Sequence, residues 1–269
     1  MSNVDQFSLI GKIVIITGGG STFSLHLAKT LLSKGVKGIT LADKTDKAER
    51  INNELREHMD KGIILFLQKD VALQSDFESI FIETLKKFKY VDVLINNAYL
   101  FDDFNWEDEI LTKLHGTINS NLLGVENYLM NNNSGAKAVI INMSSIFGLD
   151  PIPFAPVSHG VDACLVQLAM SFGHKTNYKR TNVKVIAICI GVLESKKKKS
   201  VSPINFINEF FYNTYRSTID KLPVQKDADI IAGVIEKIQS SPTGNVWYTL
   251  NGIDFKVYEF EKLPSADSQ

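Results

Sequence analysis

The stretch KIVIITGGGSTFS, residues 12–24, joins a short β-branched run directly to a glycine-rich turn. Apolar residues then recur with the spacing of one helix face at Leu25, Leu27, Ala28, Leu31 and Leu32. This order of strand, tight turn and helix is typical of the first unit of a parallel α/β sheet.

The same alternation continues along the chain. Further strands are expected at residues 38–42, 63–67, 91–95, 138–143, 183–190 and 245–250. Helices are expected at residues 48–59, 77–88, 107–130, 157–178 and 227–239. Near-continuous apolar strands separated by helices predict a parallel sheet covered on both faces. We therefore expect a single α/β domain over residues 1–269, a Rossmann-like doubly wound sheet of about seven strands with its ligand crevice at the strand C-terminal ends.

Composition narrows the class of protein. The 269 residues are 44% hydrophobic, which suits one domain with a full core. The 29 basic and 30 acidic residues nearly cancel, so no overall field attracts nucleic acid. The N-terminus lacks the pattern of a secretory signal, and no apolar run reaches membrane-spanning length. We expect a cytoplasmic protein without a membrane span, with Cys164 and Cys189 as buried, reduced thiols.

Two segments have no regular periodicity. Residues 194–216 include four consecutive lysines, Lys196 to Lys199, which predict a solvated loop or, alternatively, a phosphate-binding or targeting segment. Residues 251–269 form a tail whose polar end, from residue 264 onward, is expected to fray.

Several short motifs occur in a recognisable order. They are TGGGSTFS at residues 17–24, Asp43, Asp70-Val71, the run 96–98, Asn105-Trp106, INMSS at 141–145, Pro156-Val157, AICIG at 187–191 and GNVW at 244–247. On these motifs the chain resembles the short-chain dehydrogenase/reductase family over nearly its whole length, and in particular the NAD-dependent 15-hydroxyprostaglandin dehydrogenases and the insect alcohol dehydrogenases. The resemblance implies NAD as the cofactor and a substrate pocket under a lid formed by residues 194–216.

The glycine-rich turn departs from the family pattern Thr-Gly-x-x-x-Gly-x-Gly. Gly18 is present, but Thr22 and Ser24 stand at the second and third glycine positions. A Cβ at Thr22 would crowd the diphosphate of a dinucleotide, and a side chain at Ser24 would push the helix off the sheet. Gly19 and Gly20 offer another way to shape the turn, so NAD binding is in question.

Other cofactor positions are better preserved. Asp43 would bind the adenine-ribose hydroxyls and favour NAD over NADP, or would instead cap a helix beginning near Thr45. Tyr99 replaces the last glycine of the Asn-Asn-Ala-Gly motif, and its ring would lie near the ribose–nicotinamide path or under the loop at residues 100–105. The resemblance implies further cofactor contacts from Asp70, Val71, Asn97, Ala98 and Gly191.

The family's catalytic set is largely missing. The resemblance places the serine at Ser145, but the tyrosine position is Ser158 and the lysine position is Asp162. The asparagine position falls on His115, with Asn119 or Asn121 as alternatives. Ser158 is shorter than tyrosine and a weaker acid, and Asp162 inverts the charge of the lysine. Losing a positioned acid or base removes roughly 10²–10⁴ in rate, so the usual alcohol–ketone chemistry is expected to be lost.

The replacements suggest two other arrangements. Ser145, His115 and Asp162 are expected to line one pocket, as a hydrolase would require, although no Gly-x-Ser-x-Gly elbow surrounds Ser145. Alternatively, His115 and Asp162 pair as a structural substitute. His159 is a rival base that is expected to point elsewhere, and no third ligand completes a metal site.

Three functions follow. The main interpretation is an inactive or impaired family member that binds a small apolar or amphipathic ligand or acts as a scaffold. The alternative is an NAD-dependent oxidoreductase acting on a hydroxyl or keto lipid or an alcohol, with a rearranged site that uses His115 or a displaced tyrosine. The third is the hydrolase. The resemblance also implies a homodimer through the helices at 107–130 and 157–178, and an aromatic-rich substrate wall formed by Phe147, Ile152, Phe154, Phe206, Phe210 and Phe211.

Overall fold

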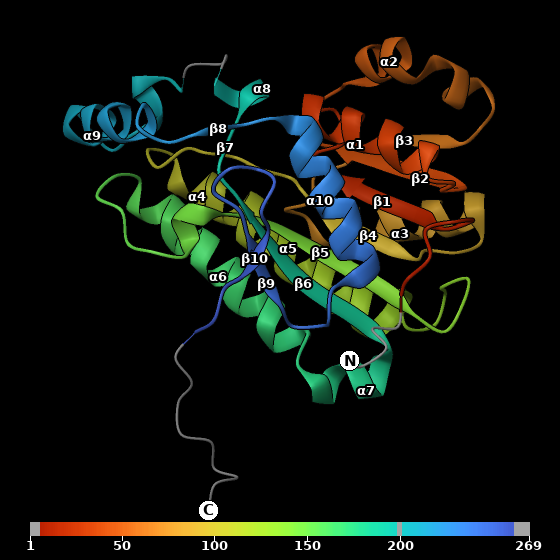
Figure 1. The fold of residues 1–269 in the computed structure, drawn as a ribbon. Coiled ribbons are helices and arrows are strands. Elements are labelled where there is room, and N and C mark those ends of the chain that lie inside the picture. The colour runs from red at the N-terminus through yellow and green to blue at the C-terminus, as the bar shows by residue number, and fades with distance from the viewer. Residues whose placement is uncertain (1–5, 198–200, 261–269) are drawn as a thin grey trace, which may run out of the picture.

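The computed structural model describes residues 6–197 and 201–260. Eight strands in these residues form one sheet in the order β10-β9-β6-β5-β4-β1-β2-β3 (Figure 1). All neighbouring strands are parallel except β10 and β9. The strands are β1 (Ile13–Thr17), β2 (Gly38–Asp43), β3 (Ile64–Gln68), β4 (Val93–Asn96), β5 (Ala138–Ser145), β6 (Val183–Ile190), β9 (Val246–Tyr248) and β10 (Lys256–Val257), and a separate pair is formed by β7 (Val192–Leu193) and β8 (Val224–Gln225).

Helices cover both faces of the sheet because successive strand residues point to opposite sides. Val14 and Ile16 pack with α1, α2 and α10, whereas Ile15 packs with α3 and α6. Figure 1 shows α1 and α10 side by side on the first face. The α-helices are α1 (Thr22–Ser33), α2 (Ala48–Asp60), α3 (Gln74–Phe88), α4 (Trp106–Glu109), α5 (Gly116–Leu122), α6 (Pro156–Phe172), α7 (Lys175–Thr181), α8 (Glu194–Lys197), α9 (Glu209–Ile219) and α10 (Asp227–Ser240).

The long helix expected at 107–130 is not a uniform α-helix. Two π-helical turns, η1 (Ile110–His115) and η2 (Leu123–Tyr128), alternate with α4 and α5. The segment expected at 157–178 is also divided, because α6 ends at Phe172 and α7 begins at Lys175. Both corrections concern helix continuity, which apolar spacing alone does not determine.

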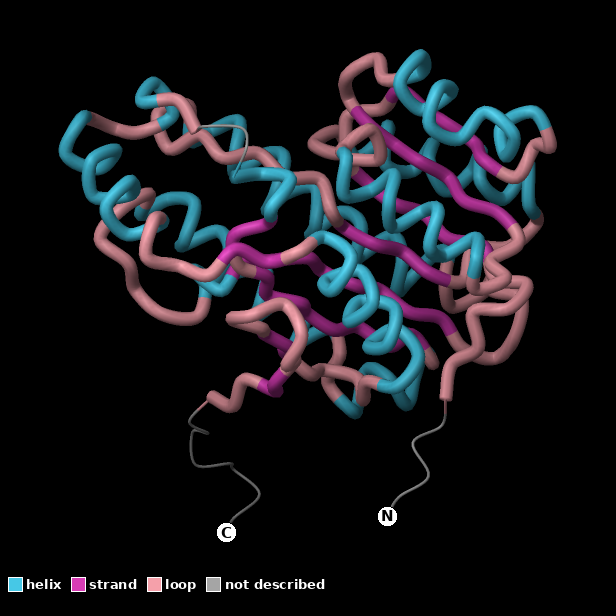
Figure 2. Tube along the Cα trace, turned by 45° about the horizontal axis from the view of Figure 1, so that its top comes forward, coloured by secondary structure: helices cyan, strands magenta, loops and turns pink. Residues whose placement is uncertain are grey.

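The two segments expected to be irregular contain regular elements. Residues 194–216 hold α8, a short 3₁₀ turn (Pro203–Asn205) and most of α9. In Figure 1, α8 and α9 both lie beyond the carboxyl ends of the strands, and Figure 2 shows the helices of this region standing away from the sheet. The tail supplies β10, while residues 198–200 and 261–269, and the expectations for them, lie outside the described part.

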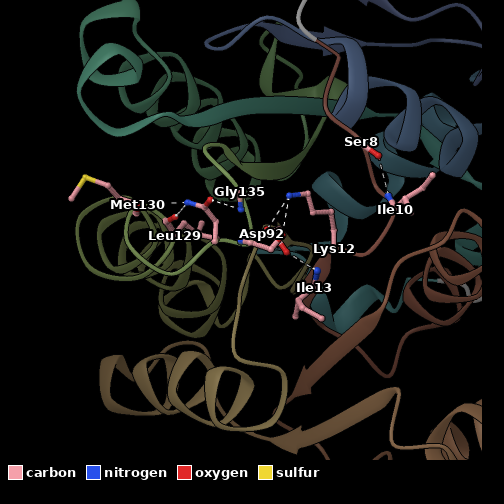
Figure 3. Close-up of polar contacts among 10 residues, drawn as sticks. Ser8, Ile10, Lys12, Ile13, Asp92, Leu129, Met130 and Gly135 are labelled. Atoms are coloured by element: carbon pink, nitrogen blue, oxygen red, sulfur yellow. Dashed lines mark hydrogen bonds and ion pairs between the residues drawn. The ribbon is translucent and has the colours of Figure 1, made fainter.

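A buried carboxylate ties together the amino ends of two central strands (Figure 3). Asp92, just before β4, accepts hydrogen bonds from Ile13 N at 2.8 Å and Ser134 N at 2.7 Å. It also pairs with the Lys12 ammonium at 3.2 Å. Because backbone amides on neighbouring segments share one carboxylate, this edge of the sheet is fixed in register.

Across residues 6–197 and 201–260, no helix is both long and apolar enough to cross a membrane. Cys189 is buried in β6 as expected, but Cys164 is exposed on α6. The prediction for Cys164 was wrong because its apolar neighbours face the sheet while its own helix position faces outward.

Candidate active site

Two cavities open at the carboxyl ends of the parallel strands. The outer crevice, of about 380 Å³, runs along the ends of β1, β2, β3 and β4. The inner cavity, of about 300 Å³, lies among β5, α6 and α9. A molecule in one cavity can contact a molecule in the other, because their walls share Asn97, Ala98, Tyr99, Ile190, Leu193 and Lys196.

The glycine-rich turn packs closely under the outer crevice. Gly18 has a φ of +62°, in the left-handed region that favours glycine. A Cβ on Gly19 would lie 2.9 Å from the Leu41 Cα of β2, which leaves no room for a side chain. Gly20 donates its N–H to Asp43 Oδ2 at 3.0 Å. Gly19 and Gly20 therefore shape the turn against β2 and do not line the crevice.

Ser24 does not push α1 off the sheet, contrary to expectation. The side chain is fully buried, donates to Gly18 O at 2.8 Å and accepts from Asn97 Nδ2 at 2.9 Å. Its hydroxyl thus links the turn to the end of β4. A small polar side chain is accommodated here because its hydroxyl is hydrogen-bonded both within the turn, to Gly18 and Ser21, and to Asn97 at the end of β4.

The first turn of α1 offers two free donors. The N-cap residue Ser21 accepts from Ser24 N, but within the described residues the N–H groups of Thr22 and Phe23 have no acceptor. Both residues line the outer crevice. Unpaired amides at a helix N-terminus are a site for an anionic group such as a phosphate.

The remaining expected cofactor residues are divided between the cavities. Asp43 is not a helix cap, since α2 begins only at Ala48; its Oδ1 instead accepts from Thr45 N at 3.1 Å and Thr45 Oγ1 at 2.8 Å. Gly191 lines the inner cavity and not the crevice. The expected residues that line the outer crevice are Gly18, Thr22, Asp43, Asp70, Val71, Asn97 and Ala98.

The inner cavity brings Ser145, Ser158 and Asp162 together, but not His115. His115 is exposed and its Nδ1 lies 2.9 Å from Ala72 O, on the side of the helix facing α3. The expected Ser–His–Asp arrangement and the expected His115–Asp162 pair are therefore both wrong. The alternative residue Asn121 is also turned away, with its Nδ2 donating to Thr117 O at 2.7 Å.

A buried charge cluster occupies the wall of this cavity. The Lys113 ammonium of η1 lies 2.9 Å from Asp162 Oδ1 and 3.0 Å from Glu109 Oε1. Ser158 Oγ donates to Glu109 Oε2 at 2.6 Å. All four residues are at most 1% exposed. The family position on α6 holds Asp162 and no lysine, but η1 supplies a lysine, Lys113, to the same cavity.

Burial sets the protonation of this cluster. Burial raises the pKa of the Asp162 carboxyl, and Glu109 adds to the shift while Lys113 opposes it. For Lys113, burial disfavours the charge, but Tyr99, Asp162 and Glu109 outweigh it and raise the pKa of the ammonium. Lys113 therefore stays charged between its two carboxylate partners.

Tyr99 lies where the two cavities meet. It lines both of them, and its ring centroid is 4.5 Å from the Lys113 ammonium and 3.8 Å from that of Lys196. Although 46% of the residue is exposed, burial of its hydroxyl raises the pKa of the phenol, with Asp162 adding to the shift and Lys113 opposing it. Of the two interpretations of Tyr99, the structure supports the position beside the crevice.

His159 lines the inner cavity too, although it was expected to point elsewhere. The imidazole is 7% exposed and its ring packs 4.9 Å from Phe154; the Ile152 backbone lies near it, but in the described residues neither ring nitrogen has a partner of good hydrogen-bond geometry. Burial, with Lys113 nearby, lowers the pKa of His159 to about 4. It is a neutral hydrogen-bonding group in an aromatic wall.

That aromatic wall differs in part from expectation. Phe147 and Phe154 line the inner cavity, joined by Phe101 and Tyr215. Phe206 is buried behind them against Tyr215, and Phe210 is 68% exposed. Helical rotation separates Phe210 from the cavity, because adjacent residues on α9 face different directions.

Comparison with known proteins agrees with this architecture. The model of the short chain dehydrogenase family matches residues 12–204. The chain belongs to the short chain dehydrogenase family. Human 15-hydroxyprostaglandin dehydrogenase [NAD(+)] is 27% identical over 254 residues, covering 93% of this chain and 95% of the relative. Alcohol dehydrogenase 2 of Ceratitis capitata is 27% identical over 252 residues, with the same coverage.

Solved structures of family members share the fold. A 3-ketoacyl-(acyl-carrier-protein) reductase from Brucella melitensis, complexed with NADH, superposes with a TM-score of 0.72 at 22% identity, covering 91% of this chain and 98% of its own. Levodione reductase superposes with a TM-score of 0.74 at 20% identity, covering 90% and 97%. These likenesses establish the α/β architecture.

Sequence reasoning about this dehydrogenase family member missed Glu109 and Lys113. One signal was available: an acidic residue on the buried face of α6 requires a cation nearby, and Lys113 lies on the helix that packs against it. Asp103 was missed as well. It accepts from Ser158 N at 2.9 Å and Val157 N at 3.1 Å, and so caps α6 from a distant loop.

Proposed function

We propose that this chain is an NAD-dependent oxidoreductase that interconverts a hydroxyl and a keto group on an apolar or amphipathic substrate. The observation that carries the proposal is the inner cavity, whose walls hold a serine, a tyrosine and a lysine together: Ser145, Tyr99 and Lys113. These are the residue types that the family uses for this chemistry, although the tyrosine and lysine come from different elements.

The outer crevice fits a dinucleotide. The free N–H groups of Thr22 and Phe23 suit the diphosphate, and the Asp43 carboxylate at the end of β2 suits the ribose hydroxyls of NAD. Asp70 and Val71 line the same crevice where the adenine would lie. When NAD is bound there, hydride transfer between its nicotinamide ring and the substrate carbon supplies the redox step.

The inner cavity supplies the proton. Ser145 Oγ accepts from Phe147 N at 3.2 Å, so its own proton is free for a bond to the substrate oxygen. The raised pKa of Tyr99 keeps its hydroxyl protonated, so it begins as a donor to a keto oxygen. The Lys113 ammonium then stabilises the phenolate left behind, and alcohol oxidation follows the same steps in reverse.

The substrate is expected to be mainly apolar with a second polar group. Phe101, Phe147, Phe154 and Tyr215 line the inner cavity and suit an apolar body. Within the described residues the His159 ring nitrogens have no well-aligned partner, since the nearby Ile152 backbone makes at most a poorly aligned contact, so a hydroxyl or carbonyl of the substrate would supply a better hydrogen bond. A hydroxy or keto lipid, or a larger alcohol, has both properties.

The test uses the purified wild-type chain. NADH binding is followed by nicotinamide fluorescence, and turnover by nicotinamide absorbance with a set of secondary alcohols, hydroxy fatty acids and the matching ketones. We expect NADH binding and turnover that is lost in Ser145→Ala. Binding without any turnover would favour the ligand-binding interpretation, and aryl-ester hydrolysis dependent on Ser145 would favour a hydrolase.

We also propose that the chain forms a homodimer through its long helices. Trp106, Leu111 and Leu122 are 44%, 46% and 47% exposed, so the segment from α4 to α5 presents three large apolar side chains to water. Burying them against a second copy would remove this surface from water. Light scattering is expected to give twice the mass of the chain, and a monomer mass would contradict the proposal.

A further inference from the structure

An arginine reaches across the outer crevice to the start of α1. Arg50, in the first turn of α2, donates from Nη2 to Thr22 Oγ1 at 2.7 Å. Thr22 is the first residue of α1 and stands at the second glycine position of the family turn. Thr22, which was expected to crowd a diphosphate, therefore fixes the position of the Arg50 guanidinium beside the crevice.

Most of the guanidinium remains available to a ligand. In the part of the chain that the structure describes, the bond to Thr22 is the single hydrogen bond that Arg50 donates. A guanidinium has five N–H donors in a planar fork. Arg50 and Thr22 both line the outer crevice, and Arg50 is half-buried there.

Two other charged residues that line the outer crevice, Asp43 and Lys69, already have partners within the protein. Both Asp43 oxygens accept hydrogen bonds from the turn and from Thr45. The Lys69 ammonium lies 3.4 Å from Asp76. Arg50 thus brings a positive charge to the same end of α1 at which the Thr22 and Phe23 amides are free.

We infer that Arg50, held by Thr22, binds the diphosphate of the dinucleotide and replaces the close backbone contact that the missing glycines provide in the family. The inference rests on the proposed function only in that the crevice binds a dinucleotide. Arginine forms charge-assisted, bidentate bonds with phosphate oxygens, which are stronger than neutral hydrogen bonds. Thr22 fixes the fork before the ligand arrives, so less side-chain freedom is lost on binding.

A phosphate in this crevice has two possible sources, the diphosphate and the 2′-phosphate of NADP. The diphosphate is favoured because Arg50 is anchored at the free amides of α1. The Asp43 carboxylate, in contrast, lies on the ribose side and repels a 2′-phosphate. The experiment separates the two sources by comparing NADH with NADPH.

The experiment titrates wild type, Arg50→Ala, Arg50→Lys and Thr22→Val with ADP-ribose, NADH, NADPH and adenosine. Arg56→Ala, an exposed arginine on the same helix, is the matched control. We expect Arg50→Ala to weaken ADP-ribose and NADH binding by about 10- to 100-fold and to leave adenosine binding unchanged. Thr22→Val, which removes the acceptor and keeps the shape, is expected to give a smaller loss, and Arg50→Lys an intermediate one.

Three outcomes would overturn the inference: equal ADP-ribose affinity in wild type and Arg50→Ala, a loss confined to NADPH, or no binding of any diphosphate compound by wild type. The proposed function is tested separately. ADP-ribose carries no nicotinamide, so Arg50-dependent ADP-ribose binding without turnover would support the inference and contradict the oxidoreductase. Turnover with NAD at an unchanged KM in Arg50→Ala would support the oxidoreductase and contradict the inference about Arg50.

Discussion

Asp92 at the amino edge of the sheet and Asp162 near its carboxyl edge are both buried carboxylates beside a lysine ammonium, but in the described residues only Asp92 also accepts from backbone amides. Asp92 accepts from the backbone amides of Ile13 and Ser134. Asp162 depends on the side-chain ammonium of Lys113. The Lys12 side chain beside Asp92 is 15% exposed, whereas Lys113, at 1%, brings a full charge into low dielectric. The first arrangement serves register, and the second places ionisable groups against a cavity.

The largest effect on stability is expected from removing the Lys113 ammonium at the carboxyl edge of the sheet. Lys113→Met leaves Glu109 and Asp162 buried without their ammonium, which lowers the free energy of unfolding by about 3–5 kcal/mol. Urea denaturation at neutral pH measures the loss. The triple variant E109Q/K113M/D162N removes the unpaired charges and is expected to regain most of the stability without regaining activity. A wild-type unfolding curve for Lys113→Met would show that the charge cluster does not form.

Tyr99→Phe tests the chemistry of the same edge without disturbing its packing. Removing the hydroxyl is expected to lower turnover by about 10²–10⁴-fold with little change in thermal stability, because the residue is half exposed. Steady-state rates with NAD measure the loss. Tyr90→Phe, another half-exposed tyrosine located before β4, is the control and should match wild type. Equal rates in the two variants would assign the proton to another group.

His159 gives the cavity edge a pH dependence. Its pKa is lowered to about 4, so the folded protein holds it neutral while the unfolded chain takes up a proton below about 6.5. The stability it contributes is present above pH 6.5 and is lost as the pH falls toward 4, by about 3 kcal/mol over that range.

His159→Phe removes this component. Urea denaturation at pH 7 and pH 4.5 is expected to show a smaller loss in the variant than in wild type. The Asp162 pKa is raised, which gives stability that falls as the pH rises, but this contribution is common to both proteins and cancels in the comparison. His26→Phe, on the exposed face of α1, should behave like wild type. An unchanged pH dependence in His159→Phe would mean that the imidazole is protonated in the fold.

The smallest effect is expected at the amino edge. Asp92→Asn keeps one acceptor for a backbone amide but loses the charge and the pair with Lys12, at a cost of about 1–3 kcal/mol. Urea denaturation measures this cost. NADH affinity should match wild type because Asp92 lies at the opposite edge from both cavities. A change in NADH affinity would show that the two edges are coupled.

The fold could be predicted from the sequence because its strands are short apolar runs separated by helices. This pattern remains recognisable even where single residues differ from the family motifs. The outer crevice could be placed for the same reason, since strand ends follow from strand positions. The sequence could not show how a departure is accommodated. Ser24 is an example: its effect depends on whether Asn97 and Gly18 lie within hydrogen-bond distance.

The inner cavity could be predicted only in part. Ser145, Ser158 and Asp162 were placed by the family pattern and do meet, but His115 was chosen by counting back along the chain to the family's asparagine position, which takes no account of the local helix geometry. The π-helical turn η1 changes that geometry, and Lys113 lies at the cavity wall instead. Contacts between segments far apart in the chain, such as Asp103 with the start of α6, have no local pattern to reveal them.

The π-helical turns have a consequence for how this site can vary among relatives. Each such turn accommodates more residues than an α-helical turn, so losing one residue from the turn at Ile110–His115 would let it close into the regular form. Residues before and after the turn would keep nearly the same relative orientation, because the wider turn uses its extra residue to complete about the same rotation. The side chains within the turn, Lys113 among them, would instead point in new directions without being replaced. Chain length at this point, as well as residue identity, therefore decides which charges reach the cavity, and an aligned lysine alone does not show that a relative shares the arrangement.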